Sequence, residues 1–285
     1  MSLSANSSYL WYNSIVRKEE MTQRHIIIGD VHGMSEELSA LLAGIQPTSE
    51  DTIVFVGDLV DKGPDSAGVV RMVREMAETS SFDVIVVEGN HEEKHRRFRR
   101  NLTVRPKVAH EQAKNDEELA KITELLGPKD VAFLESSVTF YKIPDHDAII
   151  VHGGIPGNMK SFPPDIDESQ MSSSQRKKLG LDRVQRTRYI SAKTGSPIHV
   201  ADQTPADPFW ADVYDGRFGH IIFGHQPFMT GVKEFPFATG IDTGAVHGGE
   251  LTAMIIESSG ERSFVSIPGR LMAERFKAKY SEQSA

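Results

Sequence analysis

The sequence contains no cysteine and no long uninterrupted run of apolar residues. The lack of cysteine excludes disulfides, thiolate metal sites, cysteine nucleophiles and thiol redox switches. No stretch approaches the roughly 20 apolar residues that a membrane-spanning helix requires. The first twenty residues also lack the apolar segment of a secretory signal. We therefore expect a soluble, cytoplasmic protein with no membrane partner.

Basic residues are also in short supply, because 40 acidic residues outnumber 32 basic ones and the net charge is -8. This balance argues against a protein that coats nucleic acid or anionic membrane, since such binding needs a basic surface. At 285 residues and 39% hydrophobic content the chain can bury a full core. No linker-like stretch divides it. We predict one domain over residues 23–285, preceded by a peripheral segment, residues 1–22.

What the sequence does contain is a recurring pattern, in which a short Ile- and Val-rich run is followed by Gly and then by metal-binding residue types. Runs that do not alternate with polar residues indicate strands buried on both faces. The polar residues then fall at the carboxyl ends of these strands, where α/β sheets bind ligands. The five occurrences are HIIIGDVHG (25–33), TIVFVGDLVDKG (52–63), DVIVVEGNHE (83–92), DAIIVHGG (147–154) and HIIFGHQ (220–226).

Helical periodicity between the first strands makes the pattern typical of an α/β fold. Further along the chain, the spacing predicts mostly helix over residues 92–135 and a polar surface excursion near the site over residues 155–208. Strands are expected at 251–257 and 262–267, followed by a helix from about Leu271.

Six side chains after these strands have the chemistry of metal ligands. Their carboxylate and amide oxygens and imidazole nitrogens suit Mn, Fe, Zn or Mg. Each one alone could be a helix cap or a satisfied core residue, but ligand types at five strand ends indicate a shared site. Six groups exceed the need of one ion, and a shared carboxylate could hold two ions roughly 3.5 to 4 Å apart, as in displacement at phosphorus. The six are Asp30, His32, Asp58, Asn90, His152 and His225.

The motifs GDVHG, GDLVDKG, GNHE, VHGG and GHQ resemble the successive signatures of calcineurin-like metallophosphoesterases, in particular the phosphoprotein phosphatase branch. The resemblance runs from about Arg24 to Glu257. It implies an α/β fold in which two mixed β-sheets pack as a sandwich flanked by helices, the four-layer metallophosphoesterase fold. It also implies two divalent ions at the strand ends, with Mn²⁺ expected and Fe, Zn or Mg possible.

The same resemblance implies a role for each motif residue. Asp30 and His32 would bind one ion, Asp58 would bridge, and Asn90, His152 and His225 would bind the second. His91 would donate a proton to the leaving oxygen, oriented by Asp61, and a metal-bound hydroxide would attack in line. A carboxylate partner favours the imidazolium form, as a general acid requires.

Phosphate oxygens would be bound by Lys62, Arg188 and Asn90. The family motif usually carries Arg where this chain has Lys62, and Lys supplies the charge without the bidentate fork. Arg188, in QRTRYI, matches an Arg that precedes an aromatic residue in relatives, and Arg186 is the alternative if the alignment slips. Arg188 could instead be a solvated helix residue.

The tail of the chain bears on the substrate. GHQPF and IDTGAVHGGELTA resemble bacterial-type phosphatases and symmetrical diadenosine tetraphosphatases. His247 stands where eukaryotic protein phosphatases carry an aromatic residue, and it could contact substrate or pack beside the metals. The tetraphosphatases often lack the Asp of VDKG, so Asp61 leaves the substrate open. The absence of a GH-x-H motif argues against the nuclease branch.

The run KHRRFRR, from Lys94 to Arg100, is a basic island directly after His91. It could be a solvated helix face, or it could guide a polyphosphate chain or a capped RNA end toward the site. Phe98 within it could stack on a base or belong to the core.

Three hypotheses about function follow. The first is a hydrolase of diadenosine tetraphosphate or related nucleotide phosphoanhydrides, favoured by the tail motif and the basic island. The second is a serine/threonine phosphoprotein phosphatase, favoured by the Asp61 and His91 pair. The third is a catalytically silent metal-binding module. The substrate is expected to be a nucleotide polyphosphate or another phosphorylated molecule, and no obligate protein partner is implied.

Overall fold

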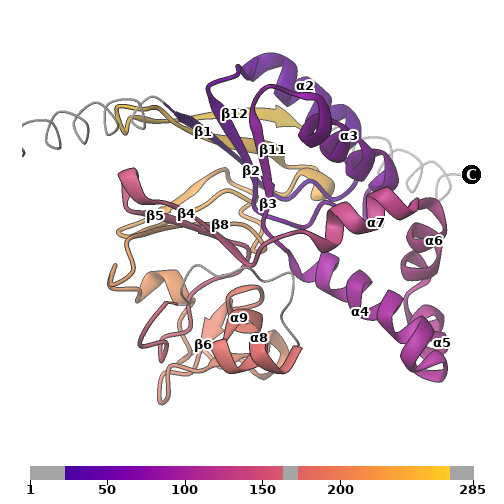
Figure 1. The fold of residues 1–285 in the computed structure, drawn as a ribbon. Helices are drawn as coiled ribbons and strands as arrows, with labels where there is room; N and C mark the ends of the chain where they lie inside the picture. Colours follow the sequence, from indigo (N-terminus) through magenta and orange to yellow (C-terminus); the bar gives the residue numbers. More distant parts are fainter. Residues whose placement is uncertain (1–22, 163–172, 270–285) are drawn as a thin grey trace, which may run out of the picture.

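The computed structural model describes residues 23–162 and 173–269, so the expected N-terminal segment and the helix from Leu271 lie outside the described residues. It is an α/β fold built on two mixed five-stranded sheets that lie against each other (Figure 1). This confirms the expected fold class. None of the helices in the described ranges is long and apolar enough to cross a membrane.

The first sheet has the strand order β12-β11-β1-β2-β3. Strands β1, β2 and β3 run parallel to one another. Strand β11 runs antiparallel to β1, and β12 runs antiparallel to β11. Parallel neighbours need a crossover, which α2 (Ser35–Ile45) and α3 (Ser66–Thr79) supply. The strands are β1 (Arg24–Ile28), β2 (Asp51–Phe55), β3 (Asp83–Val86), β11 (Glu250–Ile256) and β12 (Arg262–Pro268).

The second sheet has the order β4-β5-β8-β10-β9, with β5, β8 and β10 parallel to one another. All five strands predicted before a metal-binding motif are present, three in the first sheet and two in the second. The strands of the second sheet are β4 (Phe140–Ile143), β5 (Ala148–Val151), β8 (His220–Phe223), β9 (Lys233–Phe235) and β10 (Ala238–Gly240).

The strand sequences do not alternate with polar residues because both faces of each sheet are covered. In β1, Ile26 and Ile28 pack toward α2 and α3, whereas Ile27 packs between the sheets. In β8, Ile222 lies between the sheets, and its neighbours Ile221 and Phe223 face the outer layer. The side-chain period of two therefore sends alternate residues of one apolar run into two different cores.

Residues 92–135 are helical, as predicted, and form α4 (Asn90–Val104), α5 (Pro106–Asn115), α6 (Glu117–Leu125) and α7 (Pro128–Glu135). In Figure 1, α4, α5 and α6 extend away from the sheets as a separate helical lobe. Phe98 is buried at the centre of this lobe, against Ala109 and Leu119. Of the two alternatives for Phe98, the core position is therefore confirmed, and the buried side chain does not form a stacking surface for a base.

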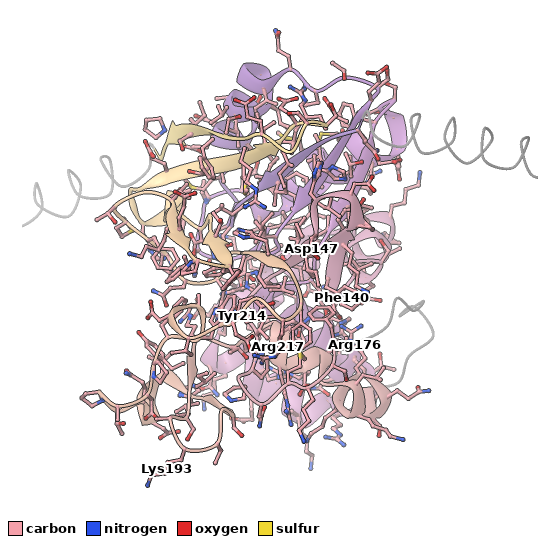
Figure 2. All side chains as sticks on the ribbon, turned by 90° about the vertical axis from the view of Figure 1, so that its left-hand side faces the viewer. Phe140, Asp147, Arg176, Lys193, Tyr214 and Arg217 are labelled. Carbon is pink, nitrogen blue, oxygen red and sulfur yellow. The ribbon has the colours of Figure 1, made fainter. Side chains whose placement is uncertain are left out.

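The segment between residues 155 and 208 is only partly a surface excursion. Leu181 and Val184 of α9 (Leu181–Val184) pack with Trp210 on the outer face of the second sheet. Lys193, in the turn between β6 and β7, lies at the lower edge of the molecule in Figure 2. The remaining elements are α8 (Ser173–Leu179), β6 (Tyr189–Ile190), β7 (Pro197–Ile198) and short 3-10 turns η2 (Pro144–His146), η4 (Val200–Asp202), η5 (Trp210–Asp212) and η6 (Ala245–His247).

Ile222→Ala should lower the free energy of unfolding by about 2 to 5 kcal/mol, because it leaves a cavity between the two sheets. Leu102→Ala is the control, since Leu102 is 48% exposed and its loss should change the free energy of unfolding by about 0.5 kcal/mol or less. Urea unfolding would measure both. Equal effects of the two substitutions would show that the contact between the sheets does not carry the stability assigned to it.

Candidate metal centre

The six predicted ligands come together at the carboxyl ends of β1, β2, β3, β5 and β8. Two groups of side chains have ligand atoms that all lie within 4.8 Å of one another. One consists of His32, Asp58 and His91, and the other of Asp58, His152 and His225. Asp58 is common to both. A single buried carboxylate therefore stands between two potential metal positions.

Asp30 and Asn90 complete the cluster. Asp30 Oδ2 lies 4.0 Å from His32 Nε2, and the Asp30 carboxylate accepts a hydrogen bond from the backbone N–H of His225. Asn90 Oδ1 lies 3.2 Å from His152 Nε2. The structure thus brings all six predicted ligands together, whereas their roles toward metal ions stay predictions.

The imidazole rings are held so that one nitrogen faces the cluster. His32 Nδ1 lies 2.8 Å from the carbonyl oxygen of Val60, and His152 Nδ1 lies 2.9 Å from that of Val56. A ring that donates Nδ1–H to a carbonyl presents the Nε2 lone pair to a metal. These contacts join the loop after β1 and the loop after β5 to the loop after β2.

The backbone is strained at the same place. His32, Asp58, Asp61, Lys62 and His225 all have positive φ, between 45° and 70°. The left-handed region is disfavoured for residues with a Cβ, and such residues concentrate at functional sites. Left-handed residues therefore follow β1, β2 and β8, and the ligands His32, Asp58 and His225 are among them.

Two glycines permit the close approach of these loops. A Cβ at Gly89 would overlap Asp58, and a Cβ at Gly224 would overlap the carboxylate of Asp30. Gly89 directly precedes Asn90, and Gly224 directly precedes His225. The Gly before each ligand therefore lets one strand end touch the carboxylate of another.

Three carboxylates are buried in this cluster, which is the strongest sign of its chemistry. Burial raises the pKa of Asp30 well above its usual value, and the neighbouring Asp242 adds to the rise. Burial also raises the pKa of Asp242 to about 6. Burial alone would raise the pKa of Asp58, but His152 and His91 hold it well below the usual value. Cations would offset this concentration of negative charge, and the mixture of oxygen and nitrogen donors fits divalent ions.

The histidines differ in their readiness to bind metal. Burial lowers the pKa of His32 to about 3 and that of His225 well below its usual value, so both rings are neutral at pH 7. Burial alone would lower the pKa of His152, but the adjacent Asp58 raises it to about 9. A proton therefore competes with metal at His152.

His91 is held by a chain of polar contacts. Its Nδ1 lies 2.5 Å from Asp61 Oδ2, and its Nε2 lies 3.8 Å from Asp58 Oδ2, facing the metal cluster. Asp61 also contacts His95 Nε2 at 2.6 Å and Lys94 Nζ at 2.5 Å. Burial alone would raise the pKa of Asp61, but the bonds from His91 and His95 lower it well below its usual value. Asp61 is therefore an ionised acceptor that fixes the ring of His91.

Sequence reasoning missed the roles of four residues of the site, namely Glu92, Lys94, His95 and Asp242. The carboxylate of Glu92 accepts hydrogen bonds from the backbone N–H groups of Asp58, Leu59 and Gly89. The position of Glu92 three residues after Gly89, the residue before α4, accounts for the bond to Gly89, as in half of a capping box, but not for the bonds from Asp58 and Leu59. Asp242 follows β10, a three-residue strand without an apolar run, so the recurring pattern did not reveal it.

The candidate phosphate-binding residues lie at different depths. Lys62 Nζ lies 2.9 Å from His32 Nε2, inside the cluster. Arg188 donates to the carbonyl oxygen of His225 at 2.5 Å, whereas Arg186 is exposed and pairs with Glu93 at 2.6 Å. His247 lies in η6 and its side chain is exposed at the surface. Partial desolvation of the ring lowers its pKa, and the charge of Lys62 lowers the pKa further. Arg188 is therefore the arginine nearer the ligands.

The basic run Lys94 to Arg100 does not form one surface. Lys94 turns inward to Asp61 and Asp116, Arg96 pairs with the buried Glu88, and Arg99 pairs with Glu135. Arg97 and Arg100 remain exposed. The single basic face expected from the sequence is therefore wrong in part, because several of these side chains bind carboxylates of the surrounding helices.

Comparison with known proteins places this geometry in a family. The profile of the family described as Calcineurin-like phosphoesterase matches residues 24–229. A relative from Halalkalibacterium halodurans, named bis(5'-nucleosyl)-tetraphosphatase PrpE [asymmetrical], is 31% identical over 88% of this chain and 97% of its own. One from Cellvibrio japonicus, named bis(5'-nucleosyl)-tetraphosphatase, symmetrical, is 26% identical over 81% of this chain and 94% of its own.

Solved structures agree on the fold. A crystal structure provisionally assigned to a diadenosine tetraphosphatase has a TM-score of 0.62 and 27% identity, covering 87% of this chain and 95% of its own. A protein serine/threonine phosphatase from Saccharomyces cerevisiae has a TM-score of 0.51 and 14% identity, covering 91% of this chain and 88% of its own, which shows the fold alone. With a matched family profile and a relative above 30% identity over most of both chains, this chain belongs to the calcineurin-like phosphoesterase family.

Proposed function

We propose that this protein is a dinuclear metal-dependent phosphohydrolase that cleaves nucleotide phosphoanhydrides, with diadenosine tetraphosphate as a representative substrate. The observation that carries the proposal is the buried Asp58 carboxylate, which is shared by two groups of potential metal ligands. The substrate class is supported by relatives that are named as bis(5'-nucleosyl)-tetraphosphatases and that align over most of the chain.

The six clustered side chains would hold the metal ions. Asp30 and His32 would bind one ion and Asn90, His152 and His225 the other, with Asp58 between them, and Mn²⁺ suits this donor set. Bound ions of this kind neutralise charge on phosphoryl oxygens and lower the pKa of coordinated water. The rest of the chemistry falls to groups of the protein itself.

His91 would supply the proton to the departing oxygen. Its Nδ1 is committed to the ionised Asp61, so the free Nε2 is the atom that can carry a transferable proton toward the cluster. Asp61 stabilises the protonated ring and fixes its orientation, and it keeps its own charge because three donors surround it.

Lys62 and Arg188 would bind the phosphoryl oxygens. Both reach the cluster, and Lys62 Nζ now donates to the Nε2 lone pair of His32. A metal bound to His32 would occupy that lone pair. The Lys62 ammonium would then lose this contact and could turn toward a bound phosphate. A Lys at this position gives charge with less control of orientation than an Arg fork would give.

A serine/threonine phosphoprotein phosphatase is the second candidate function. The contact between His91 and Asp61 favours it, because the symmetrical tetraphosphatases that the sequence resembles often lack the Asp of VDKG. The fold match to a yeast protein phosphatase is compatible with either substrate. A catalytically silent module is the third candidate, and the presence of all six clustered ligands together with His91 speaks against it.

The kcat/KM of the Mn²⁺-loaded protein should be higher for diadenosine tetraphosphate than for a phosphoserine peptide. Chromatography of the products would also give the cleaved bond, since two ADP molecules mean symmetrical cleavage and ATP with AMP means asymmetrical cleavage. Faster turnover of the peptide would favour the phosphatase. Inertness toward both and toward nitrophenyl phosphate would favour the silent module.

His91→Asn should lower kcat by about 10²- to 10⁴-fold, the range for loss of a general acid, with little change in the Kd for Mn²⁺. The control is His110→Asn, because His110 is an exposed histidine on α5. Steady-state kinetics and calorimetric metal titration would be run on both variants. Full activity in His91→Asn would remove this ring from the reaction.

Metal binding at pH 7 should release protons, because His152, with a pKa raised to about 9, must be neutral to bind a metal, and the Asp30 carboxyl, whose pKa burial raises, must be ionised. The affinity for Mn²⁺ should accordingly rise between pH 7 and about 9. Calorimetric titration in buffers of different ionisation enthalpy measures the released protons. A metal affinity that is flat over this range would show that Asp58 does not hold a proton on His152.

A further inference from the structure

Three side chains of α4 contact a single carboxylate, that of Asp61. His91 Nδ1 and Lys94 Nζ each lie 2.5 Å from Asp61 Oδ2. His95 Nε2 lies 2.6 Å from the other oxygen, Oδ1. The three donors are three and four residues apart in the sequence, so they lie on one face of the helix. One face of α4 therefore holds both oxygens of a carboxylate that is 0% exposed.

The loop that carries Asp61 has a backbone conformation that needs outside support. Asp61 and Lys62 have φ angles of 70° and 67°, so two successive residues lie in the left-handed region. Such residues persist where surrounding contacts hold them. The backbone N–H of Asp61 donates to Ser66 Oγ at 2.9 Å, and its carboxylate is held by α4. The direction of this carboxylate is therefore set by donors outside the loop.

Lys94 also joins this loop to α6. Its Nζ lies 2.7 Å from Asp116 Oδ2, and Asp116 caps α6 by accepting the backbone N–H of Glu118. Glu118 Oε2 in turn accepts the backbone N–H of Lys62 at 3.1 Å. The helical lobe of α4, α5 and α6 thus contacts the loop at two successive residues, Asp61 through its side chain and Lys62 through its backbone.

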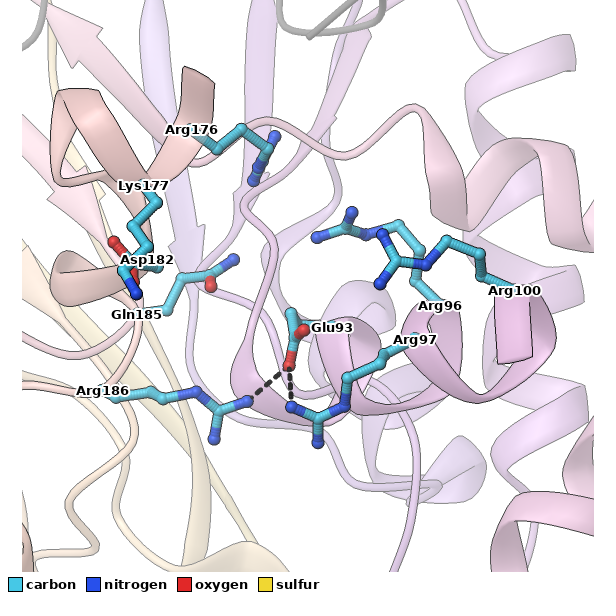
Figure 3. Close-up of a pocket in the computed structure, with 9 residues that line it drawn as sticks. All are labelled: Glu93, Arg96, Arg97, Arg100, Arg176, Lys177, Asp182, Gln185 and Arg186. Atoms are coloured by element: carbon cyan, nitrogen blue, oxygen red, sulfur yellow. Dashed lines mark hydrogen bonds and ion pairs between the residues drawn. The ribbon is translucent and has the colours of Figure 1, made fainter. Parts of the chain in front are cut away.

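The opposite face of α4 is fixed to other parts of the molecule. Figure 3 shows Glu93 of this helix between Arg97 and Arg186, and the shorter of the two ion pairs, at 2.6 Å, is with Arg186 beyond α9. Arg96 Nε lies 2.6 Å from the carboxylate of Glu88, which precedes the helix. A helix anchored on two faces supports a reacting side chain more exactly than a loop does.

We propose that Lys94 and His95 are positioning residues, which direct the proton of His91 toward the leaving oxygen by fixing Asp61. This inference deepens the proposed function and rests on it, because it takes His91 as the proton donor. As the bond between phosphorus and the leaving oxygen breaks, the proton passes from His91 Nε2 to that oxygen and the ring becomes neutral. A carboxylate that could turn would let the ring turn with it, and the proton would no longer point at the oxygen.

The test is a double-mutant cycle between Lys94→Met and His91→Asn. Lys94→Met removes the ammonium group and keeps a long side chain at a position that is 23% exposed. Lys107→Met is the matched control, because Lys107 is an exposed lysine on α5. Steady-state kinetics on the Mn²⁺-loaded proteins would give kcat for diadenosine tetraphosphate and for nitrophenyl phosphate.

Lys94→Met should lower kcat about tenfold in the wild-type background, which is the lower end for the loss of an orienting partner at a metal site. In the His91→Asn background the same change should lower kcat by less than about twofold, because no proton donor is left to direct. Lys107→Met should leave kcat unchanged in both backgrounds. A tenfold loss in both backgrounds would overturn the proposal, since Lys94 would then act independently of His91. An unchanged kcat in both would overturn it as well.

His95 is tested by two substitutions of similar size. His95→Gln keeps an N–H donor near the position of the ring Nε2, whereas His95→Met fills the buried site without a donor. His95→Met should lower kcat about tenfold, and His95→Gln should restore most of it. Equal losses in the two variants would show that the shape of the ring matters and that its bond to Asp61 does not. Urea unfolding would confirm that both variants are folded.

Proton NMR separates this inference from the proposed function, because it does not depend on turnover. A ring N–H proton gives a sharp signal when its hydrogen bond protects it from exchange with water, and loss of the signal in His91→Asn would assign it. On the Mg²⁺-loaded proteins, the signal should be sharp in the wild type and in Lys107→Met and broadened in Lys94→Met and His95→Met.

Two outcomes distinguish the proposals. If the signal broadens in these two variants while the wild type cleaves neither substrate, the proposed reaction is wrong and the positioning contacts stand. If the substrates are cleaved and the signal of His91 stays sharp in both variants, the proposed function stands and the positioning role of Lys94 and His95 is wrong.

Discussion

The structure depends on the burial of three carboxylates, Asp30, Asp58 and Asp242, at the point where strands of both sheets end. Several buried charges of one sign oppose folding unless cations or donors compensate them. The surroundings do this only in part, because the pKa values of Asp30 and Asp242 are raised while that of Asp58 is lowered. Divalent ions would stabilise the ionised form of all three. The same electrostatic demand that makes the site unfavourable for folding makes it favourable for metal.

The loops after the strands, rather than the sheets, hold these carboxylates in place. Strands β2 and β5 are buried along their whole length, and the left-handed residues His32, Asp58 and His225 lie just beyond β1, β2 and β8. Glu92 ties two of these loops together by accepting three backbone N–H groups. Because burial raises its pKa to about 7, with Asp58 adding to the rise, even this structural carboxylate responds to the charge of the cluster. The conformation of these loops and the charge of the cluster therefore depend on each other through Glu92.

Much of this was predictable from the sequence, and the exceptions have physical reasons. An apolar run, a Gly and a ligand-type residue together located Asp30, Asp58 and His225, since strand burial and close approach leave a local signature. Asp242 escaped because its strand is only three residues long. His95 and Lys94 escaped because they look like members of a basic helix face, whereas their contacts with Asp61 depend on how α4 packs against a loop more than thirty residues earlier in the chain. Contacts between charged residues that are far apart in the sequence produce no periodic pattern in it.

The same distinction explains why the family does not by itself identify the substrate. Two metal ions and a proton donor act on a phosphoryl group, and nothing in that cluster recognises what the phosphoryl group is attached to. Selectivity must therefore come from groups outside that cluster. In this chain, arginines of α4, α8 and the turn after α9 form ion pairs with the carboxylates of Glu88 and Glu93.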